Sequence, residues 1–347
     1  MAKEATNTRA EGSRRIGVIG TGRYLPEKVL ANADIAEAAG VSADWILERT
    51  GVLERRVAAS DQAASDLATE AVRDALDSAG LSADQLDLIV LTTSTPDELG
   101  PSTACRVQNL LGAPQSVALD VSAACSGWIF GARVAADWLT ADHRARYAAV
   151  VGVEVYSRFL DRGDRATAVL FGDGAAATIL GPVGPEVGFG PITLGADGRL
   201  ADDVLIRGGG SRIPATHASL DAGLHLIHMD GRAVRDFILD IFPRAAAIAL
   251  NSVGLAAERI DLLVTHQPNP ALVRALAAEA GFEADRMVVI GDRVGNIGAG
   301  STPYALATAH AEGRLHEGDR ILIVGFGAGA TWGSTVLTWG TGSGAAA

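Results

Sequence analysis

Short runs of apolar residues alternate along the chain with longer segments in which apolar residues recur every three or four positions. The runs LDLIVLTT, AAVVGVEV, DLLVTH and RILIVGF have few polar breaks, which is typical of strands buried on both faces of a sheet. The longer segments are typical of amphipathic helices. The alternation of the two predicts an α/β fold, in which a mostly parallel sheet is covered by helices.

This pattern occurs twice. The segment ALDSAGLSADQLDLIVLTTSTP, which starts at Ala75, is repeated as ALNSVGLAAERIDLLVTHQPNP, which starts at Ala249. At nearly the same offset, RYAAVVGVEV from Arg146 matches DRILIVGFGA from Asp319. We therefore expect two copies of one α/β unit.

The repeat and the composition divide the chain into three parts. We expect a disordered N-terminal segment (residues 1–15), an N-terminal half (16–185) that carries a candidate nucleophile, and a C-terminal half (186–347). Residues 181–230 are rich in Gly, Pro and Asp and have weak periodicity. A loop of this length is usually functional, so it predicts a lid or a pocket wall.

The composition is that of a globular protein, because 48% of the 347 residues are hydrophobic and 20% are charged. The net charge of -12 is spread over both halves and argues against binding to nucleic acid. The first residues are polar, and no apolar run reaches the roughly 18 residues that span a bilayer, so we expect a cytoplasmic protein without a membrane partner. No closely spaced cysteine, histidine and carboxylate set predicts a metal, and no phosphate-binding loop is present.

Cys125 follows a predicted strand that ends near Ser122, and it begins an apolar helix. A helix N-terminus presents unpaired backbone N–H groups and a positive dipole end, which favour the nucleophilic thiolate. The alternative is a buried, inert cysteine, and this segment alone leaves both interpretations open. The other cysteine, Cys105, lies in a predicted helix where we expect it to pack, and no disulfide framework is implied.

His266 ends the predicted strand IDLLVTH, where open α/β sheets place their functional residues. Asn296 lies between a predicted strand and a helix, among Gly295, Gly298 and Gly300. Its amide can donate a hydrogen bond to a developing oxyanion without adding charge. The alternatives are a structural histidine and an ordinary turn asparagine.

Four motifs occur in order along the chain: ACSGW at Cys125, HQPN at His266, GNIGAGS at Asn296, and GFGAGATWGS near the C-terminus. With the duplicated α/β pattern they resemble β-ketoacyl-acyl carrier protein synthase III, a family of initiating condensing enzymes. The resemblance extends from about Ile16 to Gly340. It implies a thiolase-like fold, a five-layered αβαβα sandwich built from two duplicated halves.

The resemblance also implies a mechanism with Cys125, His266 and Asn296 as catalytic residues. An acyl-CoA would acylate Cys125, and a malonyl thioester, carried on acyl carrier protein, would lose carbon dioxide and attack the acyl group. His266 and Asn296 would hold the enolate oxygen, while the backbone N–H groups of Cys125 and Ala328 would hold the acyl oxygen. Acyl-CoA is then a substrate, and no cofactor is implied.

Further residues are matched to substrate binding by the same resemblance. Trp45 and Arg49, in DWILERTG, would lie at the CoA entrance, and Arg165 would stack on adenine opposite Trp45. Asn269 would line the pantetheine tunnel, and Gly231 belongs to the same set.

Family members are usually homodimers, in which a loop of the partner closes the acyl pocket. The corresponding loop here is STPDELGPST, which includes Leu99, so a homodimer is expected. The helix after HQPN usually carries basic residues for docking acyl carrier protein, yet in PALVRALAAEAG only Arg274 is basic. This departure favours a relative from secondary metabolism, such as polyketide biosynthesis.

A second reaction stays open. Some proteins of this fold transfer an acyl group from the cysteine to a hydroxyl or a carrier and form no carbon–carbon bond. A hydroxymethylglutaryl-CoA synthase is a further alternative, whereas chain-extending synthases use two histidines in place of histidine and asparagine. A non-catalytic binding protein is disfavoured because all three chemical residues are present.

Overall fold

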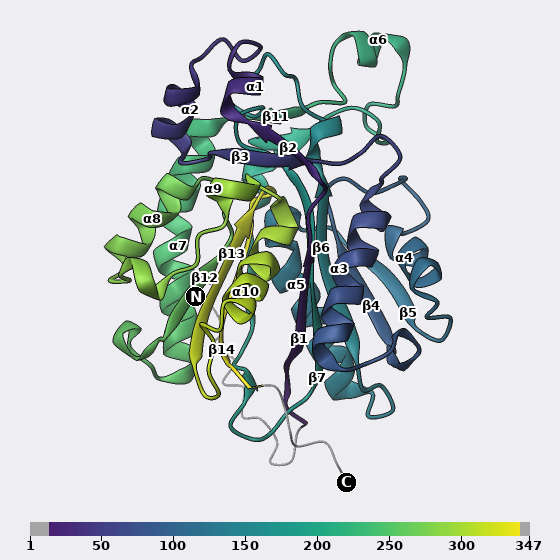
Figure 1. Ribbon diagram of the computed structural model, residues 1–347, viewed down its shortest axis with the longest axis vertical. Coiled ribbons are helices and arrows are strands. Elements are labelled where there is room, and N and C mark those ends of the chain that lie inside the picture. Colours follow the sequence, from purple (N-terminus) through teal and green to yellow (C-terminus); the bar gives the residue numbers. More distant parts are fainter. Residues whose placement is uncertain (1–13, 341–347) are drawn as a thin grey trace.

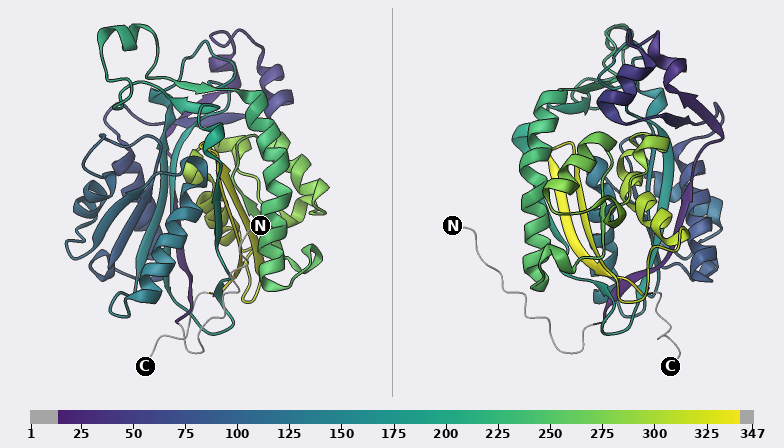
Figure 2. Two further views of the ribbon diagram at one scale, coloured as in Figure 1. Left: turned by 180° about the vertical axis from the view of Figure 1, so that it is seen from behind. Right: turned by 60° about the vertical axis from the view of Figure 1, so that its left-hand side comes forward.

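The computed structural model describes residues 14–340, which form two large sheets with helices outside and between them (Figure 1, Figure 2). In spatial order the first sheet contains β1 (Ile16–Tyr24), β7 (Asp173–Pro182), β6 (Ala148–Val155), β4 (Leu88–Thr92) and β5 (Val117–Val121). The second contains β12 (Leu262–Thr265), β13 (Arg320–Gly327), β14 (Thr331–Thr338) and β8 (Gly188–Phe189), and β9 (Thr193–Ala196) also pairs with β14.

The repeated sequence segments occupy equivalent places in the two sheets. β4 runs parallel to β6, which is antiparallel to β7, and β12 runs parallel to β13, which is antiparallel to β14. The helix before each repeated strand ends at a glycine, Gly80 or Gly254, with φ of 65° or 64°. Glycine adopts this left-handed conformation without steric cost, so the same local sequence ends both helices in the same way.

Both sheets are mixed, and the prediction of a mostly parallel sheet is therefore wrong. β14 follows β13 after a short turn, and so short a connection can join only antiparallel strands. The buried strands themselves were predicted correctly. All residues of β4, β6 and β12 are buried, as expected for strands that are covered on both faces.

Helices form three layers around the two sheets. α3 (Ala64–Ala79) and α4 (Thr103–Leu111) cover the outer face of the first sheet, and α7 (Gly231–Val253) and α8 (Pro270–Glu279) cover that of the second. Between the sheets lie α5 (Gly127–Ala141) and α10 (Ser301–Ala311). The predicted five-layered, thiolase-like sandwich is confirmed.

Smaller elements cover one end of the sandwich, at the top of Figure 1. They are β2 (Lys28–Ala31), α1 (Asn32–Ala36), α2 (Ala43–Thr50), β3 (Glu54–Val57), β10 (Val204–Ile206), α6 (His217–Asp221) and β11 (Ile227–Met229). A short helix, α9 (Gly291–Val294), lies beneath them. Within residues 14–340, no helix has the length and apolar character needed to cross a membrane.

Two expectations concern individual residues at the edges of this fold. Most of the segment expected to be disordered, residues 1–15, lies outside the described residues; Arg14 and Arg15 donate hydrogen bonds to Ala145 O and Val187 O. Cys105 is exposed on α4, so the prediction that it packs is wrong. The helical periodicity was read correctly, but the cysteine is on the solvent side of the helix.

We expect Gly152→Ala to lower the free energy of unfolding by about 1–3 kcal/mol, because the added carbon has no room. A Cβ at Gly152 on β6 would lie 2.2 Å from Ala299 O, where the two halves of the chain approach each other. Thermal unfolding measures the effect. Gly198→Ala is the control, because nothing lies within 4 Å of its Cβ, and equal melting temperatures for the two variants would contradict the expectation.

Candidate active site

A cavity of about 1000 Å³ is lined by residues of both halves of the chain, and Cys125, His266 and Asn296 are among them. Much of its wall is apolar. Leu200 and the strands β10 and β11 contribute to this wall, so the prediction that residues 181–230 form a pocket wall is confirmed. The long loop thus supplies the apolar surface that a carbon chain needs.

Cys125 lies in η2 (Ala124–Ser126), a single 3-10 turn between β5 and α5. The turn is tight: Ala124 has φ of 47°, which is unusual for a residue with a side chain. The end of β13 packs directly against it, because a Cβ at Gly327 would lie 2.7 Å from Cys125 N. A glycine is therefore required beside the nucleophile candidate.

The thiol of Cys125 is not stabilised as a thiolate, contrary to the expectation from the helix N-terminus. Burial and, to a smaller extent, the charge of Glu154 raise the pKa of Cys125, a hydrogen bond from Tyr156 acts in the opposite direction, and the resulting pKa is about 12. Burial thus outweighs the helix dipole. The sulfur carries its proton at neutral pH, so an attack by this sulfur would need a base that accepts the proton.

His266 follows the end of β12 and is 2% exposed. Burial lowers its pKa to about 3, so the imidazole is neutral at physiological pH. Its Nδ1 lies 2.7 Å from the hydroxyl of Ser301, and its ring meets the edge of Phe326. The ring is therefore fixed on two sides.

Ser301 decides which nitrogen of His266 carries the proton. When its hydroxyl donates to Gly298 O, at 2.8 Å, Nδ1 donates to Ser301 and Nε2 is free to accept a proton. When the hydroxyl turns to Nδ1, the proton lies on Nε2, which can then donate. One serine thus permits His266 to act as acceptor or donor at the same ring nitrogen.

Asn296 precedes η7 (Gly298–Gly300), the turn that leads into α10. Its Oδ1 accepts a hydrogen bond from Gly298 N at 2.9 Å, and its backbone pairs with the strand-like segment at Leu170 and Gly172. Since Oδ1 is engaged within its own turn, the amide NH₂ is the end available to the cavity. The side chain is held as a donor.

Ala328 lines the cavity directly after β13. The hydroxyl of Thr331 lies 2.9 Å from Ala328 O, 3.1 Å from Ala123 O and 2.9 Å from the hydroxyl of Ser126. This cluster ties the segment after β13 to the turn of Cys125. The backbone groups at Cys125 and Ala328 consequently lie on one rigid assembly.

The predicted entrance residues also line the cavity: Trp45, Arg49, Arg165, Asn269 and Gly231. The guanidinium of Arg165 lies 5.8 Å from the centre of the Trp45 ring, so a base enters between them only if the exposed Arg165 moves outward. Asn269 also caps α8 through Leu272 N and donates weakly to Arg49 O. Its side chain thus holds the entrance together.

Leu99 differs from the other predicted substrate-binding residues. It does not line the cavity within one subunit, and its side chain is 85% exposed on the loop between β4 and α4. Its role in substrate binding, which the resemblance assigns to a loop of a partner, stays a prediction.

The sequence did not point to three residues that the structure brings to the site: Ser301, Tyr156 and Glu154. Ser301 lies inside the quoted motif GNIGAGS, so the motif contained it without indicating its partner. Glu154 had a visible signal, since it is the one charged residue in the otherwise apolar strand AAVVGVEV. No cluster of three His, Cys, Asp or Glu that could hold a metal occurs in the described part of the chain.

Comparisons with known proteins agree with this geometry. The family model for 3-oxoacyl-[acyl-carrier-protein (ACP)] synthase III matches residues 119–198, and the model for the C terminal of the same enzyme matches residues 250–339. A β-ketoacyl-[acyl-carrier-protein] synthase III of Caldanaerobacter subterraneus subsp. tengcongensis is 42% identical over 93% of this chain and 97% of its own. An acetoacetyl CoA synthase of a Streptomyces species is 41% identical over 94% and 99%.

Among solved structures, the 3-oxoacyl-(acyl carrier protein) synthase III of Pseudomonas aeruginosa superposes with a TM-score of 0.86, at 37% identity over 94% of this chain and 98% of that one. Fold and cavity define an acyltransferase of the condensing-enzyme class. The chain belongs to the β-ketoacyl-acyl carrier protein synthase III family, as its four motifs predicted.

We expect the wild-type protein to gain the mass of an acyl group after incubation with acyl-CoA and Cys125→Ala to gain none, because the variant lacks the thiol that we expect to be acylated. Intact-protein mass spectrometry measures it. Cys105→Ser is the matched control and should label like the wild type. Acyl groups on Cys105 in the Cys125→Ala variant would contradict the assignment.

Proposed function

We propose that the protein joins an acyl group from acyl-CoA to a malonyl thioester with loss of carbon dioxide, through an acyl thioester on Cys125. The observation that supports this most is the meeting of Cys125, His266 and Asn296 in one apolar cavity, with the amide of Asn296 held as a donor. Cys125 and His266 are neutral at physiological pH, and the amide of Asn296 carries no charge at any pH. Such a site suits a reaction in which negative charge develops and disappears.

In the first half-reaction the sulfur of Cys125 attacks the acyl carbon of acyl-CoA. Its proton passes to Nε2 of His266 and then to the departing sulfur of CoA, so the thiol of CoA is released. The backbone N–H groups of Cys125 and Ala328 stabilise the oxyanion that forms at the acyl oxygen. A base is needed because the pKa of Cys125 is raised to about 12.

In the second half-reaction the malonyl thioester loses its carboxylate as carbon dioxide, and the electron pair of the broken bond forms an enolate. The NH₂ of Asn296 and the Nε2–H of His266 donate to the enolate oxygen. The carbanion then attacks the acyl carbon, the carbon–sulfur bond breaks, and the departing thiolate of Cys125 takes up one proton from solvent. Ser301 matters here because its rotation allows His266 to donate.

Acyl-CoA enters, in this proposal, along the cavity residues Trp45, Arg49, Arg165, Asn269 and Gly231. The paired ring and guanidinium of Trp45 and Arg165 suit the adenine base, since both stack on flat π-systems. We also propose a cytoplasmic location, which accords with two free cysteines and acyl-CoA as the substrate.

The malonyl group is carried on acyl carrier protein or on CoA. One observation favours CoA: Arg274 is the single basic residue of α8, and it lies 3.9 Å from Asp292, which offsets its charge. An acidic carrier protein would find little to attract it on this helix. The Streptomyces relative, an acetoacetyl CoA synthase, is in line with CoA as the carrier.

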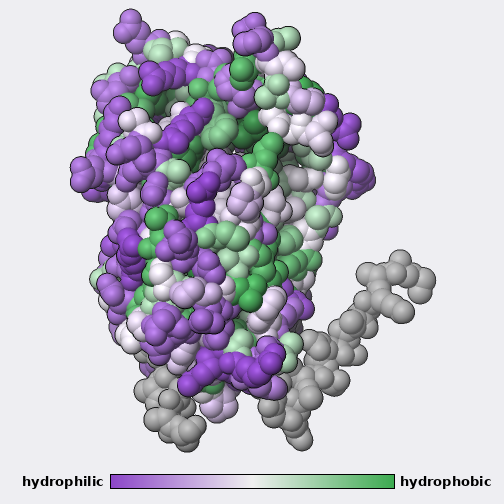
Figure 3. Space-filling model, turned by 90° about the vertical axis from the view of Figure 1, so that its right-hand side faces the viewer, coloured by the Kyte–Doolittle hydropathy of each residue, from purple (hydrophilic) through white to green (hydrophobic). Residues whose placement is uncertain are grey.

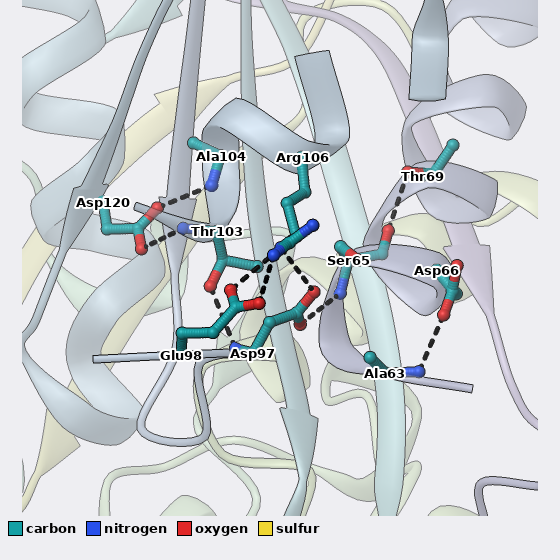
Figure 4. Close-up of polar contacts among 10 residues, drawn as sticks. All are labelled: Ala63, Ser65, Asp66, Thr69, Asp97, Glu98, Thr103, Ala104, Arg106 and Asp120. Atoms are coloured by element: carbon teal, nitrogen blue, oxygen red, sulfur yellow. Dashed lines mark hydrogen bonds and ion pairs between the residues drawn. The ribbon is translucent and has the colours of Figure 1, made fainter. Parts of the chain in front are cut away.

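We further propose a homodimer in which Leu99 enters the partner's acyl pocket. Figure 4 shows how its loop is fixed: Asp97 accepts from Ser65 N at 3.0 Å, and Glu98 pairs with Arg106. Asp120 of β5 accepts from Thr103 N and Ala104 N, which ties the loop to the edge of the first sheet. A leucine that is 85% exposed on a loop fixed in this way is available to insert into a partner.

The edge strand β5 lies beside this loop, and its backbone is unpaired on the outer side in the described structure. Figure 3 views the molecule from the side on which β5 and α4 lie in Figure 1, and hydrophobic side chains gather in the middle of this face. Val117 of β5 and Leu110 of α4 are exposed there. Pairing with a second copy would cover both the edge and the apolar surface.

We expect Leu99→Asp to raise the dissociation constant of the dimer by about tenfold or more, because it places a charge in an apolar contact. This is the effect typical of changing a residue at the centre of an interface. Sedimentation velocity across a dilution series measures the change. Leu220→Asp, at an exposed leucine of α6, is the control and should leave the dimer intact. A wild-type protein that is monomeric throughout would contradict the proposal.

Asn296→Asp tests the condensing reaction itself. The carboxylate would repel the enolate, so we expect carbon dioxide release from malonyl-CoA and from malonyl carrier protein to fall by about 100- to 1000-fold. Acylation of Cys125 should stay nearly unchanged, because it does not use the amide.

The wild type decides between the two reactions. Acylation of Cys125 without carbon dioxide release from either malonyl donor, followed by transfer to an alcohol or a carrier, would replace condensation by simple acyl transfer. Faster release from malonyl-CoA than from malonyl carrier protein would assign the extender to CoA.

A further inference from the structure

Glu154 is a fully buried carboxylate near the end of β6, with 0% of its surface exposed. Its two oxygens accept from Ser94 N at 3.1 and 3.0 Å. Oε2 also accepts from the hydroxyls of Thr95, at 3.0 Å, and Thr93, at 3.3 Å, while Oε1 accepts from Ala299 N at 3.4 Å. A charge at such a position is retained only where donors surround it, and here they come from two other segments.

One of those segments lines the cavity, and the other orients a residue that does. Ser94 lines the cavity at the end of β4, and Ala299 belongs to η7, whose Gly298 N–H orients the amide of Asn296. A Cβ at Gly298 would lie 2.8 Å from Oε1 of Glu154, so the carboxylate packs directly on that turn. Glu154 thus connects the first half of the chain to the turn that positions Asn296.

The carboxylate also lies near the turn of Cys125, because Ala299, which donates to it, packs against Gly127, where a Cβ would lie 3.3 Å from the Ala299 Cβ. Burial raises the pKa of Glu154 to about 7, and its negative charge raises the pKa values of Cys125 in η2 and of Tyr156 at the end of its own strand. The segment that follows β4, residues 93–95, and η7 donate to it through hydroxyl and backbone N–H groups. Asp173 on β7 pairs with Val155, so its side chain points to the other face of the sheet.

We propose that Glu154 is a positioning residue of the condensing reaction, which holds the Ser94 and Asn296 sides of the cavity together and whose charge restrains the reactivity of Cys125. This inference rests on the proposed nucleophilic role of Cys125. Glu154 itself does not line the cavity and acts through the segments that carry Ser94 and Asn296, which do.

The first test is the alkylation of Cys125 by iodoacetamide in a Cys105→Ser background, because Cys105 is exposed and would react. Glu154→Gln keeps the shape and removes the charge. The thiolate then forms at lower pH, although it is somewhat less nucleophilic, so we expect alkylation at about pH 8 to be about three- to tenfold faster. Intact-protein mass spectrometry over a pH series measures the shift of the profile toward lower pH.

The second test follows carbon dioxide release from a malonyl thioester by the same variant. An amide offers one acceptor atom where the carboxylate offers two, so η7 is held less firmly and we expect release to fall about threefold or more. A residue that only stabilises the fold would, when changed, expose the buried thiol and speed its alkylation whether or not the charge is kept. Faster alkylation in Glu154→Gln but not in Glu154→Asp, together with slower decarboxylation in both, is the signature of a positioning residue.

Asp173→Asn is the matched control, because Asp173, on the neighbouring strand β7, is equally buried and accepts from Ala58 N and Ser157 N. Its alkylation profile should coincide with that of the background protein. If Glu154→Gln does not fold, Glu154→Asp replaces it: the charge remains, so the profile should stay in place while carbon dioxide release falls.

The inference would be overturned if the pH profiles of alkylation coincided for Glu154→Gln and the background protein. It would also be overturned if the profile of Glu154→Asp shifted to lower pH as far as is expected for Glu154→Gln. Failure of the wild type to be acylated at Cys125 would instead overturn the proposed function. The two failures are therefore distinguishable.

Discussion

The burial of α5 and α10 between the two sheets is the constraint on which the rest of the structure depends. The sheets lie close enough to enclose these helices only because glycines face the contacts, as at Gly152 against Ala299 O and Gly131 against Val90 and Val150. Every residue of α10 from Ser301 to Ala309 is buried, so this helix can exist only inside the sandwich. Since the two halves are copies, the turns that precede these helices meet at the centre. One turn carries Cys125, and the other follows Asn296 and supplies the N–H group that orients it.

The same burial sets the charge state of the site. It raises the pKa of Cys125 to about 12 and lowers that of His266 to about 3, so both groups are neutral between these values. His266 and Glu154 make the stability of the fold depend on pH in opposite directions. His266 binds its proton less readily in the folded state, so its contribution to stability is lost as the pH falls from 6.5 toward 3. Glu154 binds its proton more readily in the folded state, so its contribution is lost as the pH rises from 4.5 toward about 7.

Much of this arrangement was predictable. The repeated segments with their terminal glycines predicted two like halves, and four motifs in order predicted the family. The strand-to-helix position of Cys125 and the strand-end position of His266 follow from periodicity alone, because helix and strand patterns differ over a few residues. The exposure of Cys105 and the mixed order of the sheets were mispredicted. The exposure of Cys105 depends on which face of its helix packs against the sheet, and the strand order depends on which strands become neighbours. Periodicity alone determines neither, because segments of equal periodicity can pack with either face inward.

The local sequence pattern thus determined which segments form helices and strands and where they end. It also determined which residues lie at the N-terminus of each central helix, because propensity and turn chemistry act over a few neighbouring residues. The tertiary structure decided what those residues can do. The neutral imidazole of His266, the shared hydroxyl of Ser301 and the carboxylate of Glu154 depend on partners from distant segments. A pKa or a proton position follows from burial and from donors across the fold, and these exist only once the two halves have closed on each other.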